Sequence, residues 1–177
     1  MKSANPVSRG LAAAVLVGTL AFVACARDKP AAAASAGPKT VMDYFPIKVG
    51  GKVVRLQLAI RQAEMQRGLM ERRDLGRDDG MLFLYGKPQQ MQFWMRNTPT
   101  ALDIGFFNPE GVLEEIYPLH PFDEKTMSSR SDRLQYALEM NQGWYRENGV
   151  KPGAQLDRKA LAEAVKARGF EPRRYGL

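Results

Sequence analysis

One short stretch of the sequence gathers most of the polar side chains that could bind or transform a ligand: Trp94, Arg96, Asn97, Thr98 and Asp103. Alternate residues of a strand face the same side, so Trp94 and Arg96 share one face while Phe93 and Met95 share the other. An indole ring beside a guanidinium and an amide can stack on, and hydrogen-bond to, a sugar, a carboxylate or a peptide. The stretch therefore predicts a ligand-binding surface, unless the guanidinium only braces the turn by pairing with a carboxylate.

Two acids and a second arginine complete the candidate site. Arg67 precedes Gly68 at the end of a predicted helix, where its guanidinium either reaches the same surface or caps helix-end carbonyls. Asp103 and Glu139 are the minimum pair for carboxylate acid–base catalysis, which requires surroundings that separate their two pKa values. Either acid is also the expected partner if Arg96 forms a bracing ion pair.

These residues leave three hypotheses open. The leading one is a protein that binds a small polar ligand or a protein partner through this surface, without catalysis, metal or cofactor. The alternative is a hydrolase of an envelope glycan or peptide that uses Asp103 and Glu139 as acid and base. In the third, the polar cluster only stabilises the fold. The polar stretch 118–133 is long enough to form a mobile lid beside the site.

The composition excludes several other classes of site. The chain has 177 residues, 45% hydrophobic and 25% charged, as in an ordinary globular protein. Cys25 and His120 are the single cysteine and the single histidine, which excludes an internal disulfide, a zinc finger, a Cys/His protease pair and a multi-histidine metal centre. The net charge of +7 is scattered along the sequence, so we expect no nucleic-acid partner.

Residues 1–24 have the pattern of a signal peptide. Lys2 and Arg9 make the start basic, and residues 11–24 form an uncharged run that is short for a membrane-spanning helix. The run leads into Phe-Val-Ala-Cys, which resembles the lipobox of bacterial lipoproteins. We therefore expect Cys25 to be lipidated and to anchor the mature protein in a membrane. The alternative is cleavage just before it by the general signal peptidase, with an unmodified thiol.

Residues 25–43 are expected to form the lipidated start and a flexible tether. Ala, Pro, Gly and Ser dominate this segment up to about Lys39. Such a tether would hold a folded domain on the periplasmic side of the cell envelope. Ala26 resembles residues that permit sorting onward, so we expect the outer rather than the inner membrane. The expected partners are the membrane, through the anchor, and a small polar ligand or an envelope protein.

Residues 44–157 carry the pattern of a β-rich α+β domain. Alternating apolar residues on both sides of Gly50-Gly51 predict a hairpin of strands 45–49 and 52–60. Apolar runs separated by turn residues predict further strands: 81–85, 91–95, 102–107, 112–117 and 134–140. A domain of this length is large enough to bury one hydrophobic core.

Helices are expected at three places. The segment 62–69 lacks β-branched residues, and Asn141 can cap a short helix that contains Trp144. A basic helix follows Leu156, where the strand pattern ends. We place this helix and the tail, residues 158–177, outside the domain as an accessory element.

Four motifs occur in order along the chain: Arg67-Gly68-Leu69-Met70, Asp79-Gly80-Met81-Leu82-Phe83, Phe93-Trp94-Met95-Arg96-Asn97-Thr98 and Leu102-Asp103-Ile104. Together they resemble the bacterial and archaeal family called domain of unknown function 192, over about residues 47–155. The resemblance implies a compact, β-rich, barrel-like fold and frequent secretion, but no established activity. One departure is Ala154, where the family usually has an acidic residue.

Overall fold

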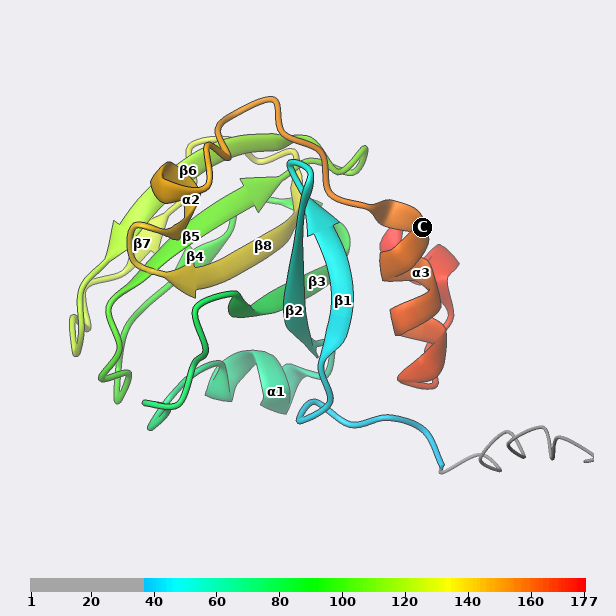
Figure 1. Ribbon diagram of the computed structural model, residues 1–177, viewed down its shortest axis with the longest axis horizontal. Helices are drawn as coiled ribbons and strands as arrows, with labels where there is room; N and C mark the ends of the chain where they lie inside the picture. Colours follow the sequence, from blue (N-terminus) through cyan, green and yellow to red (C-terminus); the bar gives the residue numbers. More distant parts are fainter. Residues whose placement is uncertain (1–36) are drawn as a thin grey trace, which may run out of the picture. The chain divides into compact units, whose positions relative to one another are not determined.

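A six-stranded mixed sheet runs through residues 37–177, the part of the chain that this computed structural model describes (Figure 1). Its strands, in spatial order, are β1 (Phe45–Val49), β2 (Lys52–Ala59), β3 (Asp79–Gln89), β8 (Leu134–Asn141), β5 (Leu102–Phe107) and β6 (Leu113–Leu119). Strands β2 and β3 are parallel, and every other neighbouring pair is antiparallel. A separate ribbon pairs β4 (Gln92–Phe93) with β7 (Met127–Ser128).

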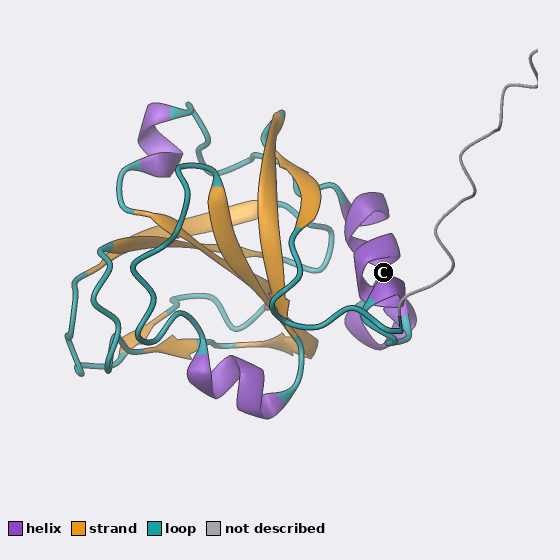
Figure 2. Ribbon diagram, turned by 60° about the horizontal axis from the view of Figure 1, so that its bottom comes forward, coloured by secondary structure: helices purple, strands orange, loops and turns teal. Residues whose placement is uncertain are grey.

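Short helical segments lie around the sheet, and the last two pack against each other near the C-terminus (Figure 2). They are α1 (Gln62–Arg67), α2 (Trp144–Glu147), α3 (Arg158–Ala167) and the 3-10 turn η1 (Pro172–Tyr175). Helix α1 lies in the crossover between the parallel strands β2 and β3, as such a connection requires. The predicted α+β class is confirmed.

The sheet is open, so the barrel-like description is only loosely correct. Strands β1 and β6 are its two edges and do not pair with each other. Isolated bridges join Val49 to Leu156 and Val112 to Gln155, so the chain that leads into α3 spans the gap between the edges at one point. The predicted hairpin is confirmed, and Gly50 and Gly51 both have the positive φ that its turn requires.

The two faces of the sheet bury two separate hydrophobic clusters, where the sequence predicted one core. We call them the first core and the second core. The first contains residues of β1, β2, α2 and α3, and the second contains residues of β4, β5 and the segment after α1. Strand β8 serves both, because Leu138 and Met140 enter the first core and Ala137 enters the second. The sequence of a strand that is buried on both faces has apolar residues at both odd and even positions.

Helix α3 is part of the first core. The Asp157 carboxylate accepts a hydrogen bond from the Ala160 N–H at 3.0 Å and caps the helix start. Leu161, Ala164 and Val165 are buried in the first core. Helix α3 therefore contributes buried side chains to the first core.

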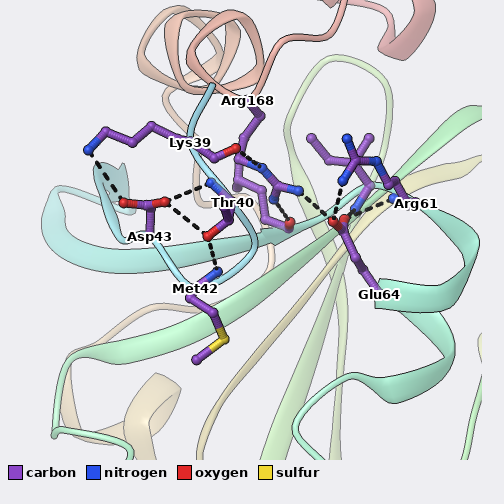
Figure 3. Close-up of polar contacts among 9 residues, drawn as sticks. Lys39, Thr40, Met42, Asp43, Arg61, Glu64 and Arg168 are labelled. Atoms are coloured by element: carbon purple, nitrogen blue, oxygen red, sulfur yellow. Dashed lines mark hydrogen bonds and ion pairs between the residues drawn. The ribbon is translucent and has the colours of Figure 1, made fainter. Parts of the chain in front are cut away.

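Arg168, just after α3, ties three distant segments together (Figure 3). Its side chain is fully buried; the guanidinium donates to the Lys39 carbonyl at 3.1 Å and to the Leu58 carbonyl. It also pairs with Glu64 in α1, with 2.6 Å between Nη2 and Oε1. Because every buried donor must find an acceptor, this arginine fixes the relative positions of the N-terminal segment, β2, α1 and α3.

The cap of α2 differs from the prediction. Gly143, at φ 88°, is the residue before the helix, and its conformation is one that only glycine adopts easily. The Asn141 side chain instead donates to the Gly76 carbonyl at 2.8 Å. Asn141 remains part of β8, which continues one residue beyond the predicted end.

The predicted signal peptide and Cys25 lie outside the described residues, as does most of the predicted tether. Within residues 37–177, no helix has the length and apolar character needed to cross a bilayer.

Candidate functional site

A pocket of about 300 Å³ opens between α1 and the second-core face of the sheet. Its walls come from α1, β3, β4 and β8 and from the turn after β4. The lining residues are Gln62, Met65, Gln66, Arg67, Gly68, Leu69, Phe83, Tyr85, Gln92, Phe93, Trp94, Thr98 and Glu139. We call this the α1 pocket. Its size is at the small end of the range for ligand sites in proteins.

Glu139 is the acidic residue of this pocket. It lies in the central strand β8, with Met81 on β3 and Ile104 on β5 directly beside it in the register. It is only 4% exposed, and no side chain of residues 37–177 is hydrogen-bonded to it. Burial raises the pKa of Glu139 from 4.5 to about 8. The carboxyl is therefore mostly protonated at neutral pH and can both donate and accept a hydrogen bond.

Tyr85 also lines the pocket, and its pKa depends in part on Glu139. Burial, and then the charge of Glu139, raises the pKa of Tyr85 to about 12. Its hydroxyl therefore remains protonated across the physiological range. The pocket thus offers two O–H groups that are neutral at pH 7, one of them a carboxylic acid.

Trp94 also lines the pocket. Phe93 and Met95 on either side of it are buried in the second core, whereas Trp94 is exposed, so the predicted alternation is present although β4 ends at Phe93, short of the predicted strand 91–95. The guanidinium of Arg96 lies 5.6 Å from the centre of the Trp94 ring. Trp94 and Arg96 therefore interact with each other, but Arg96 does not line the α1 pocket.

The predicted bracing ion pair of Arg96 is not formed within the described residues. Arg96 makes no salt bridge there, and Asp103 and Glu139 have no partner arginine. Arg67, by contrast, lies on the pocket wall and pairs with Glu71, with 3.1 Å between Nη2 and Oε2. Both side chains of that pair are exposed, so it is weak and leaves the Arg67 guanidinium available.

Asn97 and Thr98 have separate roles. Asn97 has a φ of 53° and forms the tight turn, which the preference of asparagine for this conformation explains. It lines a different hollow, with Glu71, Arg73, Pro99 and Phe122. Thr98 is buried and reaches the α1 pocket, although its hydroxyl already donates to the Arg96 carbonyl at 3.2 Å.

Asp103 lies on the other face of the sheet, which separates it from Glu139. Asp103 is opposite Met140 in the register, whereas Glu139 is opposite Ile104, so the two acids point to opposite sides. The Asp103 carboxylate accepts a hydrogen bond from the Gly143 N–H at 2.7 Å, at the start of α2. The acid–base pair of Asp103 and Glu139 is therefore not available to one substrate, and Asp103 does not belong to the binding surface.

The stretch 118–133 is held in place rather than free to act as a lid. Its β7 pairs with β4, and the Met91 N–H donates to the Ser129 hydroxyl at 3.0 Å. The carboxylate of Glu115 accepts backbone N–H groups from Arg130 at 2.9 Å and Ser131 at 2.8 Å. The strand pairing and these three hydrogen bonds hold this stretch beside Trp94.

Three of the predicted site residues, Arg67, Trp94 and Thr98, thus meet in one pocket with Glu139. Sequence reasoning missed the glutamines Gln62, Gln66 and Gln92 and the hydroxyl of Tyr85. It considered Glu139 as one acid of a pair with Asp103 and did not predict its burial. A signal was present, since apolar residues occupy both faces of the strand Leu134–Asn141, with Ala137 on one and Tyr136, Leu138 and Met140 on the other, which indicates burial on both faces.

Comparisons with known proteins agree with this arrangement at the level of the fold. The family model of domain of unknown function 192, described as uncharacterised, matches residues 45–158. A crystal structure of a protein of unknown function from Novosphingobium aromaticivorans is 36% identical, with a TM-score of 0.61 over 64% of this chain and 84% of that one.

A second crystal structure, of a proposed transcription regulator from Sinorhizobium meliloti, is 32% identical. Its TM-score is 0.59, over 64% of this chain and 94% of that one. No curated protein matches the sequence. The matched region ends at the start of α3, so the fold is shared while the basic C-terminal segment lies beyond the match.

Proposed function

This chain belongs to the family called domain of unknown function 192, and we propose that it is an exported, membrane-tethered protein that captures a small polar ligand in the α1 pocket. One observation carries the proposal. The α1 pocket contains a buried acid, Glu139, without a hydrogen-bond partner among residues 37–177. Its carboxyl oxygens are not among the fully enclosed side-chain atoms of the described residues that lack a partner, and the residue lines the pocket, so the carboxyl is suited to pair with a ligand there.

The chemistry of the pocket defines what it can hold. The protonated Glu139 and Tyr85 supply O–H donors, and the amides of Gln62 and Gln92 supply donors and acceptors in fixed places. Trp94 adds an apolar ring. A charged ligand would meet only the Arg67 guanidinium, which Glu71 already partly neutralises. We therefore expect a small polar ligand with hydroxyl or carbonyl groups and no more than one negative charge.

Export and tethering are supported by the sequence pattern around Cys25. The uncharged run and the Phe-Val-Ala-Cys motif favour lipidation. The chain contacts the folded domain at Lys39, whose carbonyl accepts a hydrogen bond from Arg168. The test is metabolic labelling with a fatty acid. We expect native protein to take up the label and Cys25→Ser to take up none. Equal uptake by both, or none by either, would contradict the tether.

The test of the pocket is a screen of small polar compounds against the full chain by nuclear magnetic resonance, with two variants of Glu139. Glu139→Gln keeps a donor and an acceptor at the same place, whereas Glu139→Leu keeps the volume and removes both. Compounds that bind the pocket should lose at least about tenfold in affinity for Glu139→Leu and little for Glu139→Gln.

The two variants also separate binding from bracing. Replacing a buried ionisable group by an apolar one of similar size is often neutral or stabilising, so Glu139→Leu should stay folded. If its stability instead falls by several kcal/mol, Glu139 serves the fold. Compounds that bind both variants and the native chain equally would place the ligand site elsewhere and contradict the proposal.

A second candidate function is acid catalysis by Glu139 alone. It is favoured by the pKa of about 8, because a carboxylic acid protonated at neutral pH can donate its proton to a leaving group. The pair of acids expected from the sequence is not formed, so a hydrolase of that design is not supported. Turnover of a bound glycan or peptide that disappears in Glu139→Gln, while binding remains, would favour this second function.

A further inference from the structure

Trp94 lies where three hollows of the surface meet. One is the α1 pocket. The second, of about 230 Å³, is lined by Gln92, Phe93, Trp94 and Thr126. The third, of about 210 Å³, lies between Trp94 and the stretch 118–127. The hollows therefore follow one another along the surface, with the indole ring shared by all three.

The backbone holds this ring in place. Strand β4 pairs with β7, and the Met95 N–H donates to the Asp123 carbonyl at 2.7 Å, which fixes the chain on both sides of Trp94. Trp94 is 46% exposed, whereas the other tryptophan of the described residues, Trp144, is 2% exposed. A half-exposed aromatic ring on a backbone held at both sides is suited to stack on a ligand, with the Arg96 guanidinium 5.6 Å from the ring centre as its protein neighbour.

We infer that the three hollows are consecutive binding sites for an uncharged oligosaccharide, with one sugar ring stacked on Trp94 and the next one in the α1 pocket. This inference rests on the proposed function and adds to it the class of ligand. A single sugar would occupy the α1 pocket, and a longer one would pass Trp94 and reach Thr126.

The lining groups favour a sugar. Apart from Arg67 and the protonated Glu139, the polar side chains that line the α1 pocket and the second hollow are amides and hydroxyls, including Gln62, Gln92 and Thr126, and they suit a molecule covered with hydroxyl groups. The third hollow carries opposite charges on Asp123 and Lys125, and therefore does not select a charged ligand of one sign.

A peptide fits these hollows less well. Peptides that bind along a strand need a row of free backbone N–H and C=O groups on a strand edge. Strands β4 and β7 have only two residues each, so they cannot hold an added strand. The groups available to a ligand here are side chains rather than backbone.

The test is calorimetric titration of the full chain with two series of soluble sugars, N-acetylglucosamine oligomers and glucose oligomers, from the monosaccharide upward. We expect affinity for one series to rise at least about tenfold from the monosaccharide to the trisaccharide, because the ring on Trp94 then adds a buried aromatic contact. Trp94→Ala should remove that gain, so that the trisaccharide binds no more tightly than the monosaccharide. Thr126→Val should weaken binding of the trisaccharide alone.

The matched control is Phe122→Ala. Phe122 is also an exposed aromatic residue, but it lines the hollow around Asn97 and not those around Trp94. Phe122→Ala should leave the increase in affinity from the monosaccharide to the trisaccharide unchanged. A change as large as that of Trp94→Ala would mean that the effect comes from the loop and not from stacking, and it would overturn the inference.

The failures of the two proposals are distinguishable. If no sugar of either series binds, or if Trp94→Ala binds the trisaccharide as well as the native chain does, the oligosaccharide inference is wrong. The screen of small polar compounds with Glu139→Leu then decides separately whether the α1 pocket is a binding site. Binding of a short extended peptide that depends on Trp94, with no binding of sugars, would overturn the inference and leave the pocket standing.

Discussion

The two faces of the central strand β8 bury polar groups in opposite ways. On the first-core face, the Tyr145 hydroxyl donates to the Leu138 carbonyl at 2.8 Å and the Tyr136 hydroxyl to the Tyr175 carbonyl at 2.6 Å. The Trp144 N–H there donates to Asp78 at 2.9 Å. On the second-core face, Glu139 has no such partner among residues 37–177 and faces the α1 pocket.

The difference separates stability from function. Paired polar groups in a closed core stabilise one arrangement of the chain. On the other face, burial disfavours the charged form of Glu139, and a ligand in the α1 pocket could supply the hydrogen bonds that the described residues do not. We therefore propose that the first core serves stability and that the second-core face serves binding. Each of the following predictions tests one side of this comparison.

The largest effect is expected from deleting residues 158–177. This deletion removes Leu161 and Val165 from the first core, and each large side chain lost from a core costs about 2–5 kcal/mol. The sum reaches the whole stability of an ordinary domain, so we expect the cooperative thermal transition to disappear. The sequence analysis predicted that 44–157 folds by itself, and a truncated chain that unfolds cooperatively within a few degrees of the native one would support that view instead.

The next largest effect is expected from Arg168→Met. The substitution leaves Glu64 and two carbonyls without their buried donor, and breaking a buried ion pair from one side costs about 3–5 kcal/mol. The matched control is Lys166→Met, because Lys166 pairs with Glu163 on the exposed surface and should cost under about 1 kcal/mol. Urea unfolding measures both. Equal small losses would show that the buried network is not needed.

A pH-dependent effect is expected from Glu139. Because its pKa is raised in the folded state, the folded protein binds more protons than the unfolded one between pH 4.5 and about 8, and stability falls as pH rises through that window. The loss is at most about 1.4 kcal/mol for each pH unit. Glu139→Gln lacks this loss, so the difference in stability between variant and native chain should increase with pH. If the difference in stability between Glu139→Gln and the native chain is the same at every pH, Glu139 does not have the raised pKa that its burial implies.

The smallest effect is expected from Asp103→Asn. The amide oxygen can still accept the Gly143 N–H, so only the charge near the start of α2 is lost, at a cost of about 1 kcal/mol or less. Ligand binding should not change, because Asp103 lies on the other face from the α1 pocket. A clear loss of binding without a loss of stability would return Asp103 to the site and contradict the assignment of the two faces.

The strands and helices were largely predictable, because they follow from local patterns. The alternation around Gly50-Gly51 and the apolar run of residues 102–107 led to correct strands, and the helix expected after Leu156 is α3. The two-residue strand β7 was not predicted, since so short a segment has no periodicity of its own.

The site was predictable only in part, because it depends on which segments meet. Strand alternation correctly directed Trp94 outward, and Arg67 does reach the same pocket. The sequence could not show that Asp103 and Glu139, on neighbouring strands, face opposite sides, because that depends on the register. Nor could it show that α1 covers the second-core face and thereby buries Glu139.

The most direct test of this account is the pKa of Glu139, measured from the pH dependence of its side-chain carboxyl carbon shift in the labelled full chain. We expect a midpoint of about 8, and we expect a compound bound in the α1 pocket to change it. A midpoint near the ordinary 4.5, unchanged by every compound that binds, would show a solvated acid and contradict the assignment of this face to binding.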